Sequence, residues 1–156
     1  MNIELLVVGK TDSKEVEALV ELYARRVNRY CRFAVTALPD VRNTRSLTQN
    51  QQRTAEGEAI LRHIPPKAYV ITLCIEGRQL SSEAIAAKLK ELFTQGKSDI
   101  VFIIGGSLGL HPSVTARADL KLSMSPMTFP HQLARVMLLE QLYRAFKIRE
   151  GSSYHK

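Results

Sequence analysis

Residues 100–110 read Ile-Val-Phe-Ile-Ile-Gly-Gly-Ser-Leu-Gly-Leu, and this stretch gives the strongest indication of the fold. The first five residues are apolar and mostly β-branched, which is typical of a strand in a parallel sheet that is covered on both faces. The glycines that follow let the backbone turn sharply and come close to a ligand. The stretch therefore predicts a buried strand that ends in a ligand-binding loop.

A second loop follows the next predicted strand. It reads Met124-Ser125-Pro126-Met127-Thr128-Phe129-Pro130-His131 and leads into a long helix. The two prolines leave this loop few conformations, and Phe129, which precedes Pro130, is pushed into an extended one. A glycine-rich loop beside a proline-stiffened loop, each at a strand end, predicts a site for a nucleotide-like ligand within residues 100–135.

Strands and helices alternate along the whole chain. The hydrophobic periodicity predicts strands at 3–8, 33–38, 68–75, 100–104 and 120–123, and helices at about 13–29, 47–63, 82–95 and 131–149. This alternation predicts an α/β fold, an open and mostly parallel sheet with helices on both faces, whose ligands bind outside the carboxyl ends of the strands. No linker divides the chain, so we expect residues 1–156 to form a single domain.

Composition narrows the class of protein. The chain has 156 residues, of which 45% are hydrophobic and 24% charged, and its longest apolar runs are too short to span a bilayer. Met1 leads directly into a predicted strand, without the pattern of a signal peptide. Cys31 and Cys74 stand alone, and no His, Cys or acidic cluster has the spacing of metal ligands. We expect a cytoplasmic protein with no metal and no membrane partner.

The net charge of +7 is unevenly distributed. Residues 1–22 carry two lysines against five acidic residues, a net charge of −3, whereas residues 23–62 carry eight arginines against three acidic residues, a net charge of +5. Guanidinium groups bind phosphates in a bidentate manner and stack on bases, which favours a nucleic-acid surface, although a solvated helix face is the alternative. The arginines are Arg25, Arg26, Arg29, Arg32, Arg42, Arg45, Arg53 and Arg62.

The glycine loop does not match the common nucleotide motifs. Its glycines at 105, 106 and 109 do not form GxGxxG, no acidic residue ends a strand about 20 residues on, and no Lys-Ser/Thr pair follows. A tight strand-to-helix turn is therefore one interpretation of the loop. The other is a backbone-lined site for a ligand without phosphates, which suits S-adenosylmethionine.

Several segments together resemble one family. They are Ile71-Thr72-Leu73, Ile104-Gly105-Gly106 with Gly109-Leu110, Leu122-Ser123 with Met127–His131, Arg135-Val136, Glu140–Ala145 and the terminal Tyr154-His155-Lys156. In this order they resemble the bacterial ribosomal RNA large-subunit methyltransferase H family, of the SPOUT class. The resemblance covers essentially the whole chain.

The resemblance implies a SPOUT-like α/β fold whose C-terminal part is threaded into a trefoil knot. It also implies a homodimer that uses S-adenosylmethionine to methylate N3 of a pseudouridine in 23S ribosomal RNA within the ribosome. By the same analogy, the cofactor contacts fall on Leu73, Gly105, Met124, Ser125, Pro126, Met127, Thr128 and Phe129.

The chemistry needs a group that takes the proton from the ring nitrogen. His131, His155 and bulk water are the candidates, and Arg135 or Arg144 could stabilise the negative charge that spreads onto the base. Each has a plainer alternative: His131 as a helix cap, for example, and Arg144 as the partner of Glu140 in a surface pair.

We expect substrate RNA to contact two regions. Arg25, Arg26 and Arg29 are predicted to bind phosphates, while Tyr154, His155 and Lys156 could stack on and hold the target base. A frayed terminus is the alternative for the last three residues.

The last predicted helix is apolar on more than one side, which favours a dimer interface over a simple core helix. Its apolar residues are Leu133, Val136, Met137, Leu139, Leu142, Tyr143 and Phe146. Two other functions stay open at this point. One is a noncatalytic RNA- or ribosome-binding protein on the same scaffold. The other is a small nucleotide-dependent enzyme of the ordinary Rossmann type, which the missing fingerprint disfavours.

Overall fold

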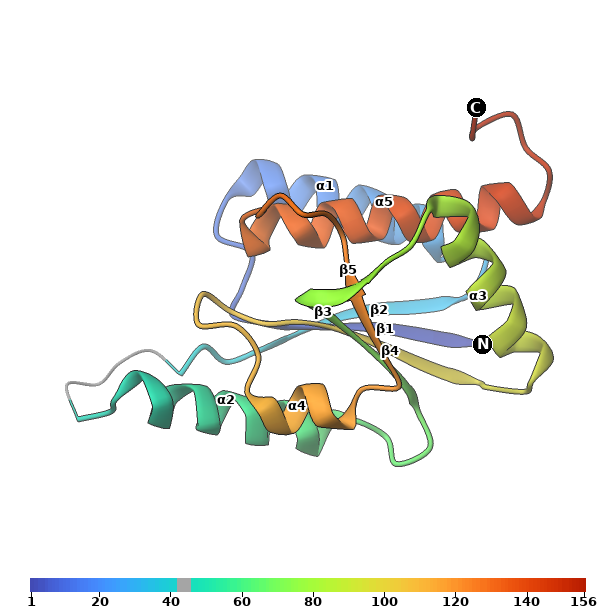
Figure 1. Cartoon of the computed structure of the whole chain (residues 1–156). Coiled ribbons are helices and arrows are strands. Elements are labelled where there is room, and N and C mark those ends of the chain that lie inside the picture. The colour runs from blue at the N-terminus through green and yellow to red at the C-terminus, as the bar shows by residue number, and fades with distance from the viewer. Residues whose placement is uncertain (42–45) are drawn as a thin grey trace.

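The computed structural model describes residues 1–41 and 46–156. Arg42 and Arg45 of the predicted basic segment lie outside the described residues. Along the chain the elements are β1 (Asn2–Val8), α1 (Lys14–Val27), β2 (Arg32–Leu38), α2 (Gln49–His63), β3 (Tyr69–Gln79), α3 (Ser82–Thr94), β4 (Asp99–Ile104), α4 (Pro112–Arg117), β5 (Leu120–Ser123) and α5 (His131–Arg149) (Figure 1).

The five strands form one sheet in the order β2-β1-β4-β3-β5, and every neighbouring pair is parallel. All strands therefore end at the same edge, where the loops that follow β4 and β5 lie close together. This confirms the predicted α/β class with a parallel sheet. The trefoil knot stays a prediction.

Helices cover both faces of the sheet, with α1, α3 and α5 on one side and α2 and α4 on the other (Figure 1). Successive strand residues point to opposite faces, so Leu5 packs beneath α5 while Leu6 packs with Ile60 of α2. Because each face has its own core, the strands are apolar almost without interruption. Among the described residues, no helix is both long and apolar enough to cross a membrane.

Helices α1, α2 and α3 begin at polar caps that the sequence supplies. The side chains of Ser13 and Ser81 accept hydrogen bonds from backbone N–H groups in the first turns of α1 and α3. Thr48 and Gln51 form a capping box at the start of α2. Each such cap contributes about 1 kcal/mol to the stability of its helix.

Two elements differ from the sequence-based prediction. Helix α4 is too short to show an apolar period, and it begins with His111 as its cap and Pro112 in its first turn. Strand β3 continues beyond its predicted end at residue 75 and pairs with β5 on both sides of a register shift. Gly77 allows this, because a Cβ there would lie 2.6 Å from the backbone of Leu122.

Helix α5 has the predicted limits, and part of its apolar surface belongs to the core of the subunit. Leu138, Leu139, Leu142 and Phe146 are buried in the core that α5 shares with α1, α3 and the sheet. The expectation that a terminal helix has a core on one side only was wrong here, because α5 lies between two other helices (Figure 1). Leu133, at the start of α5, remains 45% exposed.

Candidate functional site

A cavity of about 690 Å³ opens at the carboxyl ends of β3, β4 and β5. We call it the cofactor pocket. Its walls are residues 73–76 of β3, the glycine loop 105–110, most of the segment 122–131 from the end of β5 onward, and Arg53 of α2. Of the eight residues predicted to hold the cofactor, all line this pocket except Pro126, which lies in the second loop but not in its wall. The fold thus brings the two loops together, as the sequence predicted.

The glycine loop is closely packed. A Cβ on Gly105 would lie 3.0 Å from the Leu110 side chain and 3.1 Å from the Gly109 backbone. Gly109 has φ +75°, which favours glycine, and its N–H donates to the carbonyl of Gly106 at 3.0 Å. The loop therefore keeps its course close to the pocket because residue 105 has no side chain.

The second loop is held by its own serines. The Ser125 hydroxyl accepts a hydrogen bond from the Met127 N–H at 3.0 Å, and the Ser123 hydroxyl donates to the Ser125 carbonyl at 3.3 Å. Together with the two prolines, these bonds hold backbone groups at the pocket wall. Such a wall can bind a base edge and a ribose.

Most of the pocket wall is apolar or backbone, with few charged side chains. Arg53 and Glu76 are the charged groups of opposite sign, and His131 is a third titratable group. Burial raises the pKa of Cys74, which also lines the pocket. With Arg53 as its one Arg or Lys side chain, this wall does not fit a ligand that carries a row of phosphates.

The two candidates for catalysis at the start of α5 have different surroundings. His131 is half-buried and lines the cofactor pocket, and the cap of α5 is Pro130 rather than His131. Arg135 is fully buried and donates to the Val8 carbonyl at 2.8 Å and to the Thr11 hydroxyl at 3.2 Å. Burial lowers the pKa of Arg135. This placement favours a role for Arg135 in holding the loop after β1 over the catalytic role predicted from the sequence.

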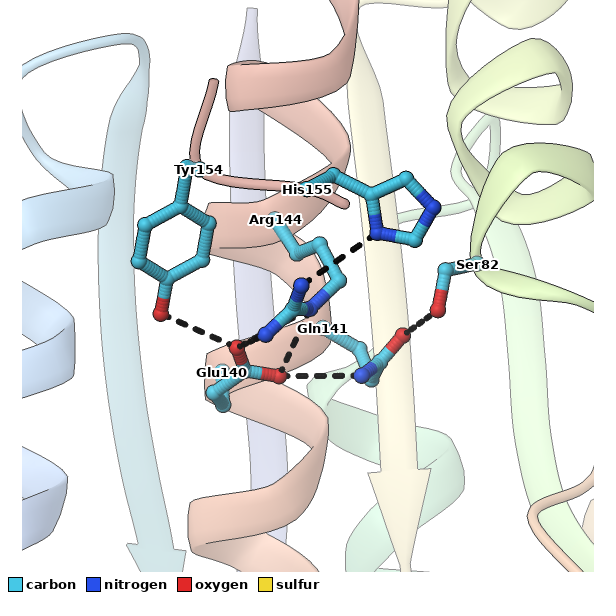
Figure 2. Close-up of polar contacts among 6 residues, drawn as sticks. All are labelled: Ser82, Glu140, Gln141, Arg144, Tyr154 and His155. Carbon is cyan, nitrogen blue, oxygen red and sulfur yellow. Dashed lines mark hydrogen bonds and ion pairs between the residues drawn. The ribbon is translucent and has the colours of Figure 1, made fainter. Parts of the chain in front are cut away.

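The C-terminal tail folds back on α5 and forms a polar cluster with it, which we call the tail cluster (Figure 2). Glu140 is at its centre: it pairs with Arg144 at 2.6 Å and accepts a hydrogen bond from the Tyr154 hydroxyl at 3.1 Å. Gln141 donates to Glu140 and is bonded to Ser82 of α3. The tail is therefore docked on α5 and is not frayed.

His155 lies between two charged groups of the same subunit. Its Nδ1 is 3.2 Å from Arg144 Nη1, and its Nε2 is 2.7 Å from a carboxylate oxygen of Glu83 at the start of α3. Because a guanidinium can only donate, this arrangement assigns the acceptor role to Nδ1 and the proton to Nε2. The hydrogen bond from His155 lowers the pKa of Glu83.

A second cavity, of about 510 Å³, lies beside the tail cluster and shares three lining residues with the cofactor pocket. Glu140 and Gln141 form part of one wall, and Leu122, Ser123 and Met124 form part of another. The same three residues also line the cofactor pocket. The segment after β5 therefore has the predicted cofactor site on one side and the tail cluster near the other.

The predicted phosphate-binding arginines also meet the tail. Arg25, Arg26 and Arg29 line a shallow pocket of about 450 Å³ together with Tyr143 and Tyr154. The Arg26 guanidinium lies 5.5 Å from the ring centre of Tyr143, whose ring is 5.0 Å from that of Tyr154. The sequence predicted two separate regions for RNA, and the fold joins them in one groove. Lys156 is exposed at the chain end.

Sequence reasoning missed three residues of these sites. Arg53 was counted only as part of the basic segment, Glu83 only as part of a helix, and Tyr143 only as an apolar residue. No local spacing could reveal them, since each acquires its partners through packing. Among residues 1–41 and 46–156, no three His, Cys, Asp or Glu side chains gather as metal ligands would.

The whole chain resembles a known family of proteins. Residues 1–155 match the family described as predicted SPOUT methyltransferase. The chain is 47% identical to proteins named ribosomal RNA large subunit methyltransferase H from Levilactobacillus brevis and Bifidobacterium adolescentis, with both chains covered completely.

The fold also has a counterpart among solved structures. A chain described as a probable methylase family protein from Haemophilus influenzae Rd KW20 has a TM-score of 0.52 and 13% identity. The alignment covers 99% of this chain and 70% of that one. At this identity the likeness shows a shared fold.

Proposed function

The chain belongs to the ribosomal RNA large subunit methyltransferase H family of SPOUT methyltransferases, and from this membership we propose that it methylates 23S ribosomal RNA with S-adenosylmethionine, at N3 of a pseudouridine. The observation that carries the proposal is the placement of the cofactor pocket and the tail cluster on two sides of residues 122–124. A donor site and a surface suited to an RNA base thus lie within one subunit, next to each other.

We assign the cofactor to the cofactor pocket. Leu73 and Phe129 supply apolar wall, while the backbone at Gly105 and along Met124–Thr128 can meet the polar edges of the adenosine. S-adenosylmethionine supplies an electrophilic methyl group when bound. The contribution of this chain is alignment and exclusion of water, which can account for much of the acceleration of such a transfer.

The acceptor nitrogen must lose its proton, and the tail cluster has groups that can assist. Arg144 is a cation held by Glu140, so it can stabilise negative charge on the carbonyls of the base. His155 offers Nδ1 as a proton acceptor when that atom is released from Arg144. His131 is the alternative base, at the cofactor pocket itself.

The groove formed by α1 and the tail is the proposed RNA surface. Three arginines beside two tyrosines, with Arg26 over the Tyr143 ring, suit an RNA strand, because guanidinium groups bind phosphates while aromatic rings stack on bases. Exposed Lys156 adds a further positive charge at the end of the tail. We propose that the substrate is 23S ribosomal RNA within the ribosome, which places the protein in the cytoplasm.

We also propose that the chain forms a single domain over residues 1–156 and acts as a homodimer. Three exposed large apolar residues support an interface near the site. Ile75 and Met127 line the cofactor pocket and are 78% and 66% exposed, and Leu133 follows on α5. Burying them against a second copy would remove this apolar surface from water.

The test is methyl transfer from labelled S-adenosylmethionine to 50S subunits and to 70S ribosomes that lack this modification. We expect label in 23S ribosomal RNA, and mass spectrometry of the digested RNA should locate it on N3 of a pseudouridine. Calorimetry should show saturable binding of S-adenosylmethionine and none of NAD. A protein that binds ribosomes but shows no affinity for S-adenosylmethionine would instead be a noncatalytic RNA-binding protein on this scaffold.

A further inference from the structure

Arg53 is the permanently cationic side chain in the wall of the cofactor pocket. It comes from α2, which packs on the face of the sheet opposite α5, and it is distant in sequence from every other part of that wall. The half-buried guanidinium reaches the glycine loop across this distance. Neither the family motifs discussed above nor the local sequence assigns it a role.

Two hydrogen bonds hold the guanidinium in place. Arg53 Nε and Nη2 donate to the carbonyl of Leu110 at 3.2 Å and 2.7 Å. Helix α2 also lies tightly against the next residue of that segment, since a Cβ on Gly57 would come within 2.9 Å of the His111 side chain. The position of the charge relative to the pocket is therefore defined by packing and not by a free surface side chain.

A single carbonyl does not use all the N–H donors of a guanidinium, and a carbonyl does not neutralise its charge. A cation at the wall of a partly enclosed pocket favours an anionic group on the ligand. S-adenosylmethionine carries one anionic group, the carboxylate of its methionine part.

We propose that Arg53 binds the methionine carboxylate of the cofactor and so selects ligands that carry the amino-acid part. This inference rests on the proposed function, since it assumes that S-adenosylmethionine occupies the cofactor pocket. Arg53 then has two roles: one part of the guanidinium holds the glycine loop through Leu110, and the remaining donors face the ligand.

The experiment compares two ligands that differ in the relevant group. S-adenosylhomocysteine has the carboxylate, whereas 5′-methylthioadenosine keeps the adenosine and the thioether but lacks the amino-acid part. The variant Arg53→Gln removes the charge while its amide can still donate to Leu110. The variant Arg62→Gln is the matched control, because Arg62 is exposed on the same helix and does not line the pocket.

For Arg53→Gln, calorimetry should show S-adenosylhomocysteine binding weakened roughly tenfold to a hundredfold, as expected for loss of a charge-assisted hydrogen bond. Binding of 5′-methylthioadenosine should be unchanged, and Arg62→Gln should bind both ligands like the wild type. Equal weakening of both ligands would reduce Arg53 to a support of the loop and overturn the proposal. Unchanged affinity for S-adenosylhomocysteine would overturn it too. If the wild type binds neither ligand, the proposed function itself fails, which is a distinguishable result.

Discussion

At the scale of single residues, two neighbouring glycines in the glycine loop differ in the side chain that each position can accommodate. A Cβ on Gly105 would meet Leu110 and Gly109 at 3.0–3.1 Å, whereas one on Gly106 would lie in ordinary contact with Val8 at 3.6 Å. The sequence argument attributed the need for glycine at 105 to the approach of a ligand. The structure adds that the loop itself fills this space.

Gly105→Val should therefore displace the loop and weaken S-adenosylmethionine binding. Overpacking of this kind costs about 1–3 kcal/mol, so we expect an affinity loss of tenfold or more by calorimetry. Circular dichroism should show a folded chain. Gly106→Ala is the matched control and should bind the cofactor nearly as well as the wild type. An unchanged affinity in the Gly105→Val variant would exclude the glycine loop from the site.

A second residue, Glu56 of α2, makes stability depend on pH. Its side chain is buried near Gly106, and burial, together with the nearby charge of Asp40, raises its pKa. The folded state therefore favours the protonated carboxyl. The stability associated with this proton is fully present below the usual carboxyl pKa of about 4.3 and is lost as the pH rises through the higher pKa of the folded state.

Glu56→Gln should consequently stabilise the protein at pH 7, and this gain should shrink as the pH falls toward 4. Urea unfolding of both proteins at the two pH values measures the difference. The exposed neighbour Glu58 supplies the control, because Glu58→Gln should change stability little at either pH. A Glu56→Gln variant that is less stable at pH 7 would contradict this account of the buried carboxyl.

At the scale of elements, α1 and the tail line one groove, but we expect them to have different roles in RNA binding and in methyl transfer. Arg25 and Arg26 of α1, and Arg29 just after it, are placed to bind phosphates, which determine affinity and its dependence on salt. The tail, docked through Tyr154 and His155, is placed to act on the target base. Variants of α1 should therefore change the affinity for ribosomes, whereas variants of the tail should change the rate of methyl transfer.

Changing Arg25, Arg26 and Arg29 to Gln should weaken ribosome binding and reduce the slope of log affinity against log salt by about 2. Cofactor binding should be unaffected. Deletion of residues 154–156 should instead lower the rate of methyl transfer at saturating ribosomes, by roughly a hundredfold if His155 is the base. Full turnover after the deletion, or an unchanged salt slope in the arginine variant, would show that the corresponding element has been assigned wrongly.

At the scale of the whole molecule, the burial of several apolar residues of α5 changes the argument for a dimer. Leu139 and Leu142 are buried in the core of the subunit. Fewer apolar residues of α5 are therefore exposed for a dimer interface than the sequence suggested. Leu133 remains, and it lies next to the cofactor pocket. An interface there would bring a second subunit close to the site.

We expect the wild type to sediment as a dimer at micromolar concentration. Leu133→Glu should shift it toward the monomer without unfolding it, because this side chain is already partly exposed. Met137→Glu is a more severe change at a half-buried position and should give a monomer or an unfolded chain. Arg62→Glu, on the opposite face of the sheet, should remain a dimer. A monomeric wild type would overturn the dimer.

The sequence alone determined most of the fold, because its strands are apolar on both faces and its loops carry glycine and proline at the strand ends. These are local signals, so they predicted four of the helices, the parallel sheet and the two loops that lie together at the cofactor pocket. They could not predict α4, which is too short to show a period, or the continuation of β3 past Gly77, which depends on the approach of β5.

Only the tertiary structure shows which polar side chains form hydrogen bonds with residues distant in the sequence. Arg53 reaches Leu110 across 57 positions, and His155 meets Glu83 across 72. Arg135 looked like a possible catalytic cation, yet its guanidinium is enclosed beside Val8. A charged side chain carries no periodicity that reveals its partner. Its role follows from how the layers pack, and that is a property of the assembled sheet and helices rather than of any one segment.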